Sequence, residues 1–248
     1  MAAVAVGHGG ADAHGVGMNQ RHIMSAQQGT LDIPVVVIPY RDRRAHLDVA
    51  LARFKDFPVV VVEQCDVLPF NRGSLLNVGF NAAVRRYGAM RVLLHDVDLI
   101  PDDTLLQMYR DPWPKPVVHF GARFRRYNDS PKYFGGVHGF EVQYFPGYPN
   151  GFFGWGGEDD ALLKRLPRRS ITYARKGEYV DLEGYPTARH KLAMLPGDTK
   201  CGNKWELLAA DNAREDNHLT LLDNRQEERW VEADHRVYWG EIRHRREA

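Results

Sequence analysis

One stretch of the chain holds most of the residues whose types suit chemistry. It is Asn150–Asp160, with the sequence Asn-Gly-Phe-Phe-Gly-Trp-Gly-Gly-Glu-Asp-Asp. Glycine at this density is typical of a backbone that takes positive φ angles or lies close to a ligand. The tryptophan offers a flat apolar surface, and the three final carboxylates offer a base. Acids also suit a helix N-terminus, and 158–166 has a helical pattern. The stretch is therefore either a turn into an acidic helix start or a sugar-binding, catalytic loop.

A second group of acids follows a short apolar segment, Arg91–His95. Asp96 and Asp98 lie one residue apart there, and Pro101 ends the segment. In open α/β sheets, ligands bind beyond the carboxyl ends of the strands. Carboxylate oxygens suit Mg²⁺ and Mn²⁺, which often complete their coordination with substrate phosphates. Asp-x-Asp alone is a common pattern, but its place at a strand end predicts a divalent metal site.

The elements that would position these acids alternate between strand and helix. Two β-branched runs, 33–40 and 58–63, predict buried strands, and apolar faces over 45–54 and 74–87 predict helices. With 91–95 as the third strand, this order predicts an α/β fold. Further along we expect short strands after Pro112 and over 171–174, a helix over 204–213, and one or two edge strands within 228–242. The segment 184–203 is predicted to be a long loop.

The composition is that of an ordinary globular protein. The chain has 248 residues, of which 44% are hydrophobic and 26% charged. A net charge of +1 gives no electrostatic case for binding nucleic acid or an anionic membrane. Two cysteines, Cys65 and Cys201, are too few for a disulfide framework and lack zinc-site spacing. Whether they pair is left open.

The N-terminal part of the chain differs from the rest. Residues 1–30 are rich in Gly, Ala, His and Gln and lack the basic start and apolar core of a signal peptide. We expect a disordered leader over 1–30 and a single catalytic domain over 31–248. No apolar run approaches the length of a membrane span. We therefore expect a soluble, cytoplasmic protein, or a Golgi-lumenal one if the chain is an excised catalytic domain.

Five motifs occur in one order along the chain, and together they resemble one known family. They are Ile38-Pro-Tyr-Arg-Asp-Arg43, Phe70-Asn-Arg72 with Leu75-Leu-Asn-Val-Gly-Phe80, Asp96-Val-Asp-Leu-Ile-Pro101, Tyr133-Phe-Gly-Gly136 and Gly154-Trp-Gly-Gly-Glu-Asp-Asp160. Over 34–190 the chain resembles the β-1,4-galactosyltransferase family, glycosyltransferase family 7. The resemblance implies a GT-A-type fold, in which helices flank a mixed, mostly parallel central sheet. It also implies an inverting, Mn²⁺-dependent transfer of galactose from UDP-galactose to the hydroxyl of a saccharide acceptor.

The resemblance also assigns roles to the residues at matching positions. Asp159 would be the general base, which takes the acceptor proton during an inverting transfer. Asp98 and His190 would bind Mn²⁺. The UDP-sugar donor would contact Pro39, Arg41, Arg43, Phe70, Arg72, Asp96, Val97, Tyr133, Gly136 and Trp155. The acceptor would contact Tyr133, Gly156, Gly157, Glu158 and Asp160. Trp155 would move when the donor binds, and Tyr133 would favour galactose over its N-acetylated relative.

The chain also departs from the family pattern. The family completes its metal site with a methionine or a second histidine near the position of His190, and here those positions hold Thr187 and Leu192. The third ligand is therefore open. Motifs of both the lactosamine-making and the proteoglycan-linker branches occur, so the acceptor could be xylose, glucose or N-acetylglucosamine. The alternatives are a transferase for UDP-GalNAc or another UDP-sugar, and a sugar-nucleotide-binding module without catalysis.

Overall fold

A computed structural model describes residues 32–130, 133–212, 226–233 and 236–244. The leader predicted over 1–30 lies outside these ranges. Within them, no helix has the length and apolar character needed to cross a membrane.

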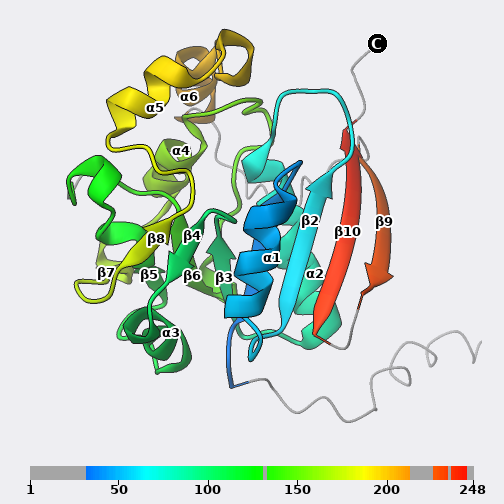
Figure 1. The fold of residues 1–248 in the computed structure, drawn as a ribbon, viewed down its shortest axis with the longest axis vertical. Coiled ribbons are helices and arrows are strands. Elements are labelled where there is room, and N and C mark those ends of the chain that lie inside the picture. The colour runs from blue at the N-terminus through cyan, green and yellow to red at the C-terminus, as the bar shows by residue number, and fades with distance from the viewer. Residues whose placement is uncertain (1–31, 131–132, 213–225, 234–235, 245–248) are drawn as a thin grey trace, which may run out of the picture.

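The centre of the fold is an eight-stranded sheet in the order β7-β5-β6-β3-β1-β2-β10-β9 (Figure 1). The neighbours β3, β1, β2 and β10 run parallel, whereas β6 and β9 run antiparallel to β3 and β10. Strand β5 is antiparallel to β6 and parallel to β7. The strands are β1 (Val35–Tyr40), β2 (Val59–Gln64), β3 (Arg91–His95), β5 (Val117–His119), β6 (Val137–Glu141), β7 (Ile171–Tyr173), β9 (Gln226–Glu232) and β10 (Val237–His244). The predicted mixed, mostly parallel sheet is confirmed.

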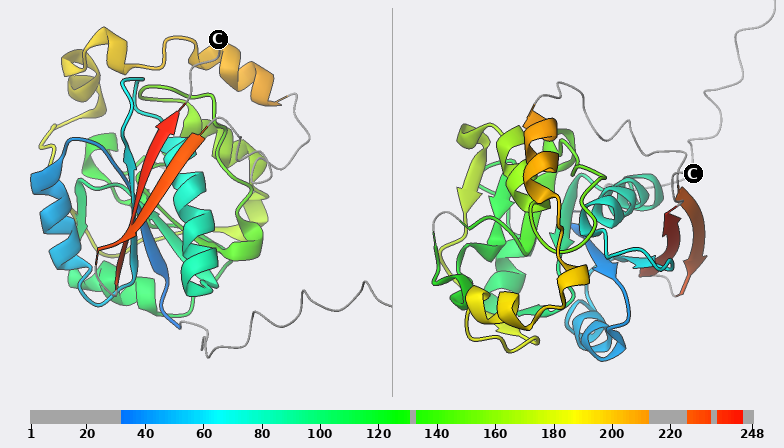
Figure 2. Two further views of the ribbon diagram at one scale, coloured as in Figure 1. Left: turned by 90° about the vertical axis from the view of Figure 1, so that its right-hand side faces the viewer. Right: turned by 90° about the horizontal axis from the view of Figure 1, so that it is seen from above.

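Helices lie on both faces of this sheet, with α1 and α2 on opposite sides (Figure 2). The helices are α1 (Arg44–Arg53), α2 (Arg72–Tyr87), α3 (Asp103–Arg110), α4 (Glu158–Arg165), α5 (Ala188–Met194) and α6 (Lys204–Asn212). Short 3-10 turns occur at Phe120–Ala122, Arg125–Tyr127, Val142–Tyr144, Arg168–Ser170 and Gly197–Thr199. The fold is therefore a three-layer arrangement with one hydrophobic cluster on each side of the sheet.

Alternate residues of β1 supply the two clusters. Val35 and Val37 pack with the residues of α2, whereas Val36 and Ile38 pack on the opposite face with α1. Side chains of a strand alternate between faces, so a strand covered on both sides must be apolar throughout. Gly79 lets α2 lie close to the sheet, because a Cβ atom there would be 2.3 Å from a methyl group of Val37. These contacts explain the continuous apolar runs in the sequence.

A second, two-stranded sheet brings distant acids together. Strand β4 (Leu99–Pro101) leaves the main sheet directly after Asp98 and pairs antiparallel with β8 (Tyr179–Asp181). The register places Leu99 opposite Asp181. The amide of Leu182 then donates to the carbonyl of Asp98 at 2.8 Å. This pairing holds the end of β8 beside the end of β3.

One expectation from the sequence was wrong, and another was only partly right. The segment 184–203 is not one long loop, because it contains α5, whose first turn is capped by the hydroxyl of Thr187 accepting from the amide of His190. Of the one or two edge strands expected within 228–242, β9 is an edge strand because it ends the sheet, whereas β10 lies between β2 and β9. The alternation of residue types suggested an edge, although β10 is paired along both sides.

Candidate active site

Arg72 is the centre of the candidate site, since it joins three elements. It is the first residue of α2, where the side chain of Asn71 caps the helix by accepting from the amide of Ser74. The guanidinium of Arg72 donates to Asp96, at the end of β3, at 2.6 Å, and to Asp159, in the first turn of α4, at 2.9 Å. Two N–H donors of one rigid guanidinium therefore link the two acidic motifs, which lie far apart in the sequence.

The carboxylates around Arg72 outnumber its single positive charge. Glu158 also lies 3.7 Å from the guanidinium, beside Asp159 and Asp96. Burial raises the pKa of Asp159 to about 8, against the opposing charge of Arg72 and with the support of Glu158 and Asp96. Burial likewise raises the pKa of Glu158. Burial disfavours the charge of Arg72 too, but Asp159 and Asp96 hold its pKa well above the ordinary value. Asp159 is thus a half-buried carboxylate that gains or loses a proton near neutral pH.

The space around Asp159 is tightly defined. The hydroxyl of Tyr148 donates to its Oδ1 atom at 3.1 Å. On the other side, a Cβ atom at Gly135 would lie 2.7 Å from Oδ2 and 2.8 Å from the hydroxyl of Tyr133. Only glycine fits there. Gly136 follows at φ +78°, and its carbonyl accepts from Arg72 at 3.3 Å. The Tyr-Phe-Gly-Gly motif therefore lets the backbone approach the acids closely.

The glycine-rich loop is anchored on both sides before α4 begins. The amide of Gly154 donates to the carbonyl of Phe70 at 2.9 Å, and Trp155 exchanges backbone hydrogen bonds with Thr199 and Cys201. At φ +91°, a Cβ atom on Gly154 would lie 2.7 Å from the backbone carbon of Lys200. The three acids do form the first turn of α4. They have different surroundings, however, because Glu158 and Asp159 lie against Arg72 whereas Asp160 is exposed.

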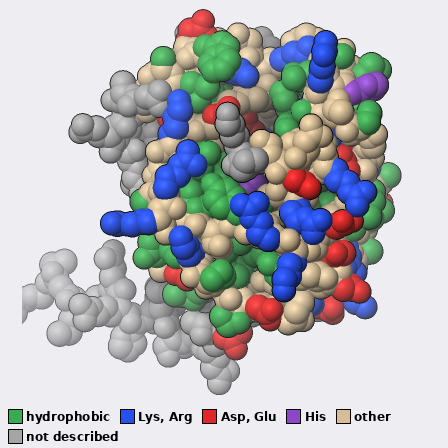
Figure 3. All heavy atoms as spheres, turned by 90° about the vertical axis from the view of Figure 1, so that its left-hand side faces the viewer, with side chains coloured by type: hydrophobic (Ala, Val, Ile, Leu, Met, Phe, Trp, Pro, Cys, Tyr) green, Lys and Arg blue, Asp and Glu red, His purple; other side chains and the backbone are tan. Residues whose placement is uncertain are grey.

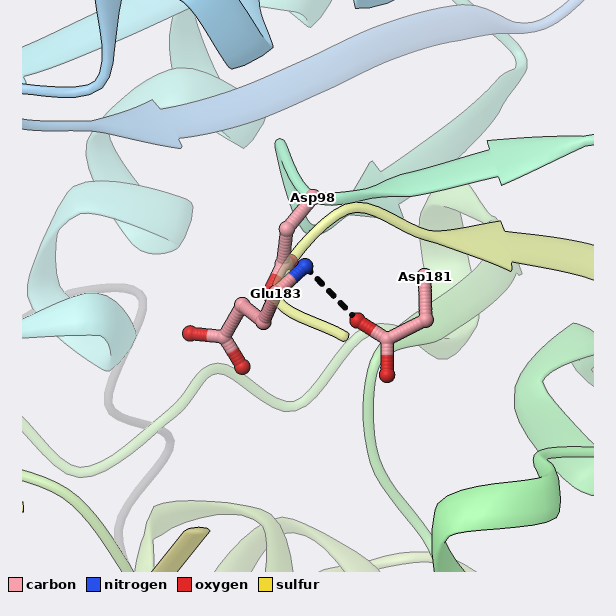
Figure 4. Close-up of side chains that lie close together, drawn as sticks. All are labelled: Asp98, Asp181 and Glu183. Carbon is pink, nitrogen blue, oxygen red and sulfur yellow. Dashed lines mark hydrogen bonds between the residues drawn. The ribbon is translucent and has the colours of Figure 1, made fainter. Parts of the chain in front are cut away.

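A second acidic group lies at the end of β3. Single carboxylate oxygens of Asp98, Asp181 and Glu183 lie within 4.8 Å of one another (Figure 4). The amide of Glu183 also donates to Asp181 at 3.1 Å. Burial raises the pKa of Asp98 to about 7, with support from Asp96 and Glu183. Three oxygen donors at this spacing suit a hard divalent cation such as Mg²⁺ or Mn²⁺.

Basic side chains surround the same acidic group. Arg43 contacts Asp98 at 3.4 Å and Glu183 at 2.9 Å. Lys191 contacts Glu183 at 2.5 Å, and Arg126 contacts both Glu183 and Asp181. Burial works against the charge of Glu183, but Lys191, with Arg43 and Arg126, lowers its pKa to about 2. A metal ion at this site would compete with these cations for the same oxygens.

The predicted metal ligands are not all in this group. Asp98 belongs to it, whereas His190 lies exposed on α5, with its ring 6.0 Å from that of Tyr185. The sequence reasoning missed Asp181 and Glu183. Their signal was an acid-x-acid pattern at the end of a short strand, the same signal that identified Asp96 and Asp98.

The other residues predicted to bind the UDP-sugar donor form two groups of contacts. Arg41 donates to the carbonyl of Leu68 at 2.7 Å and lies over the ring of Phe70 at 5.5 Å. Tyr133 stacks on Tyr127 with ring centroids 3.9 Å apart, near Asp159. Of the other predicted donor positions, Pro39 and Val97 are buried and Trp155 is half-buried. Of the predicted acceptor positions, Gly156 is half-buried, and Gly157 is buried at the N-cap of α4.

A cavity of about 300 Å³ lies beyond Asp181, between the segments 123–129 and 178–186. The face of the molecule over this part of the fold carries many lysine and arginine side chains (Figure 3). Those in the cavity wall are largely paired, since Arg125 contacts Glu178 at 3.0 Å and Arg126 contacts Asp181. The cavity is therefore of mixed charge and does not select for an anion.

Comparisons with known proteins match most of this chain to one family. Residues 26–110 match the N-terminal region of glycosyl transferase group 7, and residues 115–191 match a second model, described as the N-terminal domain of galactosyltransferase. The mouse β-1,4-galactosyltransferase 6 is 33% identical over 165 residues, 59% of this chain and 42% of the relative. Human β-1,4-galactosyltransferase 1 is 33% identical over 161 residues, 58% of this chain and 39% of the relative. The chain spans about two fifths of the length of these relatives.

Solved structures agree with this match. The catalytic domain of Drosophila β-1,4-galactosyltransferase 7, in complex with xylobiose, aligns with a TM-score of 0.64 at 24% identity and covers 86% of this chain and 94% of that one. A mutant of the same enzyme in complex with manganese, UDP-Gal and xylobiose aligns with a TM-score of 0.63 at 25% identity over the same shares. The expected GT-A-type fold is confirmed. The chain belongs to the β-1,4-galactosyltransferase family, glycosyltransferase group 7.

Proposed function

We propose that this chain transfers galactose from UDP-galactose to a saccharide hydroxyl with inversion, forming a β-1,4 linkage. One observation carries the proposal: Asp159, a half-buried carboxylate with a pKa of about 8, lies 2.9 Å from Arg72 beside the glycine-rich loop. A general base works best when its pKa is close to the working pH. The neighbour complexed with manganese, UDP-Gal and xylobiose supports this choice of metal, donor and acceptor class.

In the proposed reaction Asp159 acts as the base in a single displacement. Its free oxygen takes the proton of the acceptor hydroxyl while the hydroxyl oxygen bonds to the anomeric carbon of galactose. The bond from that carbon to the diphosphate breaks, and UDP leaves with the bonding electrons. Because the pKa of Asp159 is near neutrality, the carboxylate is ionised in a useful fraction of molecules and holds the proton once it has arrived.

The other residues would hold the donor. Phe70 and Arg41 form a flat, cationic surface suited to the uracil ring, and Arg72 would neutralise phosphate charge while keeping Asp96 and Asp159 in place. Asp98 and His190 are the proposed protein ligands of Mn²⁺, and the carboxylates of Asp181 and Glu183 offer further oxygens beside Asp98. When bound, the metal would stabilise charge on the departing diphosphate.

The loop around Trp155 would exclude water from the reaction. The ammonium group of Lys191 lies 5.8 Å from the centre of the Trp155 ring, and the same lysine contacts Glu183 in the acidic group. Movement of the loop would therefore displace Lys191 and change its contact with Glu183 at the proposed metal site. A transferase needs such closure, because water is otherwise a competing acceptor.

A screen with purified protein and Mn²⁺ tests the proposal. UDP-galactose and UDP-GalNAc are each incubated with a xyloside, glucose or N-acetylglucosamine, and the transferred sugar and linkage are identified by mass spectrometry and NMR. We expect a β-1,4-galactoside with at least one acceptor and an Mn²⁺ requirement. Preference for UDP-GalNAc would refute the role of Tyr133. Binding of UDP without transfer to any acceptor would support the non-catalytic alternative.

A further inference from the structure

The hydroxyl of Tyr148 occupies a buried position between the proposed base and a histidine. It donates to Asp159 at 3.1 Å and lies 3.3 Å from Nδ1 of His138 on β6. The guanidinium of Arg72 lies 3.4 Å from the same oxygen and 5.6 Å from the centre of the tyrosine ring. Tyr148 and His138 are both fully buried. The hydroxyl is therefore held by partners from three directions.

The backbone of Tyr148 is fixed as firmly as its side chain. The amide of Tyr148 donates to the side chain of Asn77 on α2 at 2.8 Å, and the side chain of Asn77 donates back to the carbonyl of Tyr148 at 2.8 Å. Asn77 is itself fully buried. Buried side-chain amides with both groups satisfied set a single local geometry. Tyr148 is thus positioned by α2, the same helix that presents Arg72.

The direction of the hydrogen bonds at the Tyr148 hydroxyl follows from the protonation state of His138. Burial, with the charges of His119 and Arg72, holds its pKa well below the ordinary value, so the ring is neutral. Among the residues that the structure describes, its Nε2 atom is buried and has no hydrogen-bond partner. An orphaned buried N–H is rare and costly, which favours the tautomer with the proton on Nδ1. His138 then donates to the Tyr148 oxygen, which leaves the Tyr148 proton for Asp159.

We propose that Tyr148 and His138 form a positioning pair that stabilises the carboxylate form of Asp159 and fixes its orientation for proton transfer. The inference rests on the proposed role of Asp159 as the base. No covalent step is assigned to either residue. The proton of the acceptor stays on Asp159, because passing it on would create an imidazolium at His138 in an apolar site.

The other charged and titratable groups that face Asp159 act alongside this pair. Arg72 on α2 stabilises its carboxylate, whereas Glu158 in α4 and Asp96 at the end of β3 destabilise it. The hydroxyls of Tyr133 and Tyr127 lie on the side of Gly135. The charged form of Asp159 is therefore disfavoured by burial and by two acids, and it is favoured by one guanidinium and one hydroxyl. Because the Tyr148 hydroxyl lowers the pKa of Asp159, removing it should raise that pKa.

The test compares Tyr148→Phe with the wild type. Phenylalanine keeps the ring under Arg72 and removes only the hydroxyl. We expect the titration midpoint of Asp159 to rise by about one pH unit, the size of a hydrogen bond to a charged group. The rate at pH 7 should then fall about tenfold and recover above pH 9, because the ionised fraction of the base changes by that factor. Tyr144→Phe is the matched control, since Tyr144 is 44% exposed.

The titration is read directly by NMR of protein labelled with ¹³C at the aspartate carboxyl carbons, with Asp159→Asn used to assign the signal. An unchanged Asp159 midpoint in folded Tyr148→Phe overturns the inference, whatever the activity. If the wild type proves inactive with every sugar, the proposed function fails, but the NMR comparison still decides the role of Tyr148.

Variants of His138 separate positioning from packing. His138→Leu should raise the titration midpoint of Asp159, as Tyr148→Phe does, but by less. The reason is that the Tyr148 hydroxyl can still donate its proton to Asp159. His138→Asn places an amide nitrogen where Nδ1 lies and should restore the wild-type midpoint. A lower midpoint in His138→Leu would show that the histidine competes with Asp159 for the tyrosine proton and would refute the assigned tautomer.

Discussion

Replacing Asp159 with asparagine should abolish transfer and stabilise the protein. Asparagine keeps the shape of the side chain but cannot take a proton, so the transfer rate should fall about 10²- to 10⁴-fold, the usual contribution of a general base. Stability should rise because the carboxylate is buried beside two other acids and shares one guanidinium with them. Arg72 would keep Asp96 and Glu158 as partners, so the variant leaves no unpaired cation.

The size of the gain follows from the pKa of Asp159. A carboxyl group with a pKa of about 8 in the folded protein and 3.8 when unfolded destabilises the fold at pH 8 by at most about 6 kcal/mol. The side chain is 23% exposed, and the variant loses the contact with Arg72, both of which reduce that figure. We expect a gain of roughly 1–3 kcal/mol, which raises the Tm by about 2–10 °C for a chain of this size.

The pH dependence of the stability difference between Asp159→Asn and the wild type is the clearest test of its sign. Between pH 4 and 8 the folded protein keeps a proton on Asp159 that the unfolded chain releases, so wild-type stability falls as the pH rises through this window. The advantage of Asp159→Asn should therefore be absent near pH 4, grow up to pH 8 and then level off. Urea unfolding at four pH values measures it, with Asp48→Asn, an exposed ion-pair residue, as the control. An equal or lower stability at pH 8 would refute the reasoning.

Three further variants test other parts of the structure. Asp98→Asn should weaken Mn²⁺ binding at least about tenfold by titration calorimetry, since it removes a charged oxygen donor from the acidic group; unchanged affinity would place the metal elsewhere. Gly79→Ala should lower the free energy of unfolding by about 1–3 kcal/mol, because its methyl group would meet Val37; a neutral result in urea unfolding would show that α2 moves away freely. Gly154→Ala should cost about 1–3 kcal/mol through its positive φ and its contact with Lys200; if protease sensitivity at the loop did not increase, the anchoring described above would be wrong.

The sequence predicts the centre of the fold well because local patterns determine it. The apolar runs within β1, β2 and β3 are covered on both faces, which explains their continuous hydrophobic residues. The strand-end position of Asp98 and the acids after the glycine-rich loop were visible for the same reason. Each depends on a few neighbouring residues and on the rule that ligands lie beyond strand ends.

The parts that could not be predicted depend on contacts between distant segments. Asp181 and Glu183 join Asp98 only because β8 pairs with β4, about eighty positions earlier in the chain. Tyr148 and His138 look like core residues in the sequence, and their place beside Asp159 follows from the packing of β6 and α2. Helix α5 was hidden in a Gly- and Pro-rich segment, where its local signals are the Thr187 cap and a short run of helix-forming residues.

The surroundings of Asp159 decide between the two interpretations of the acidic motif. An acid in the first turn of a helix stabilises it by roughly 0.3–1 kcal/mol, and it does so while exposed to water. Asp160 meets that description, since it is exposed on the same turn. Asp159 does not, because its raised pKa means that burying its charge costs more than a helix start returns. The contacts with Arg72 and Tyr148 offset only part of the cost of charging this half-buried carboxylate, because its pKa stays raised. Groups of this kind gather where a protein uses the shifted pKa. The helix start therefore accounts for Asp160, whereas the surroundings of Asp159 support the proton transfer proposed for it.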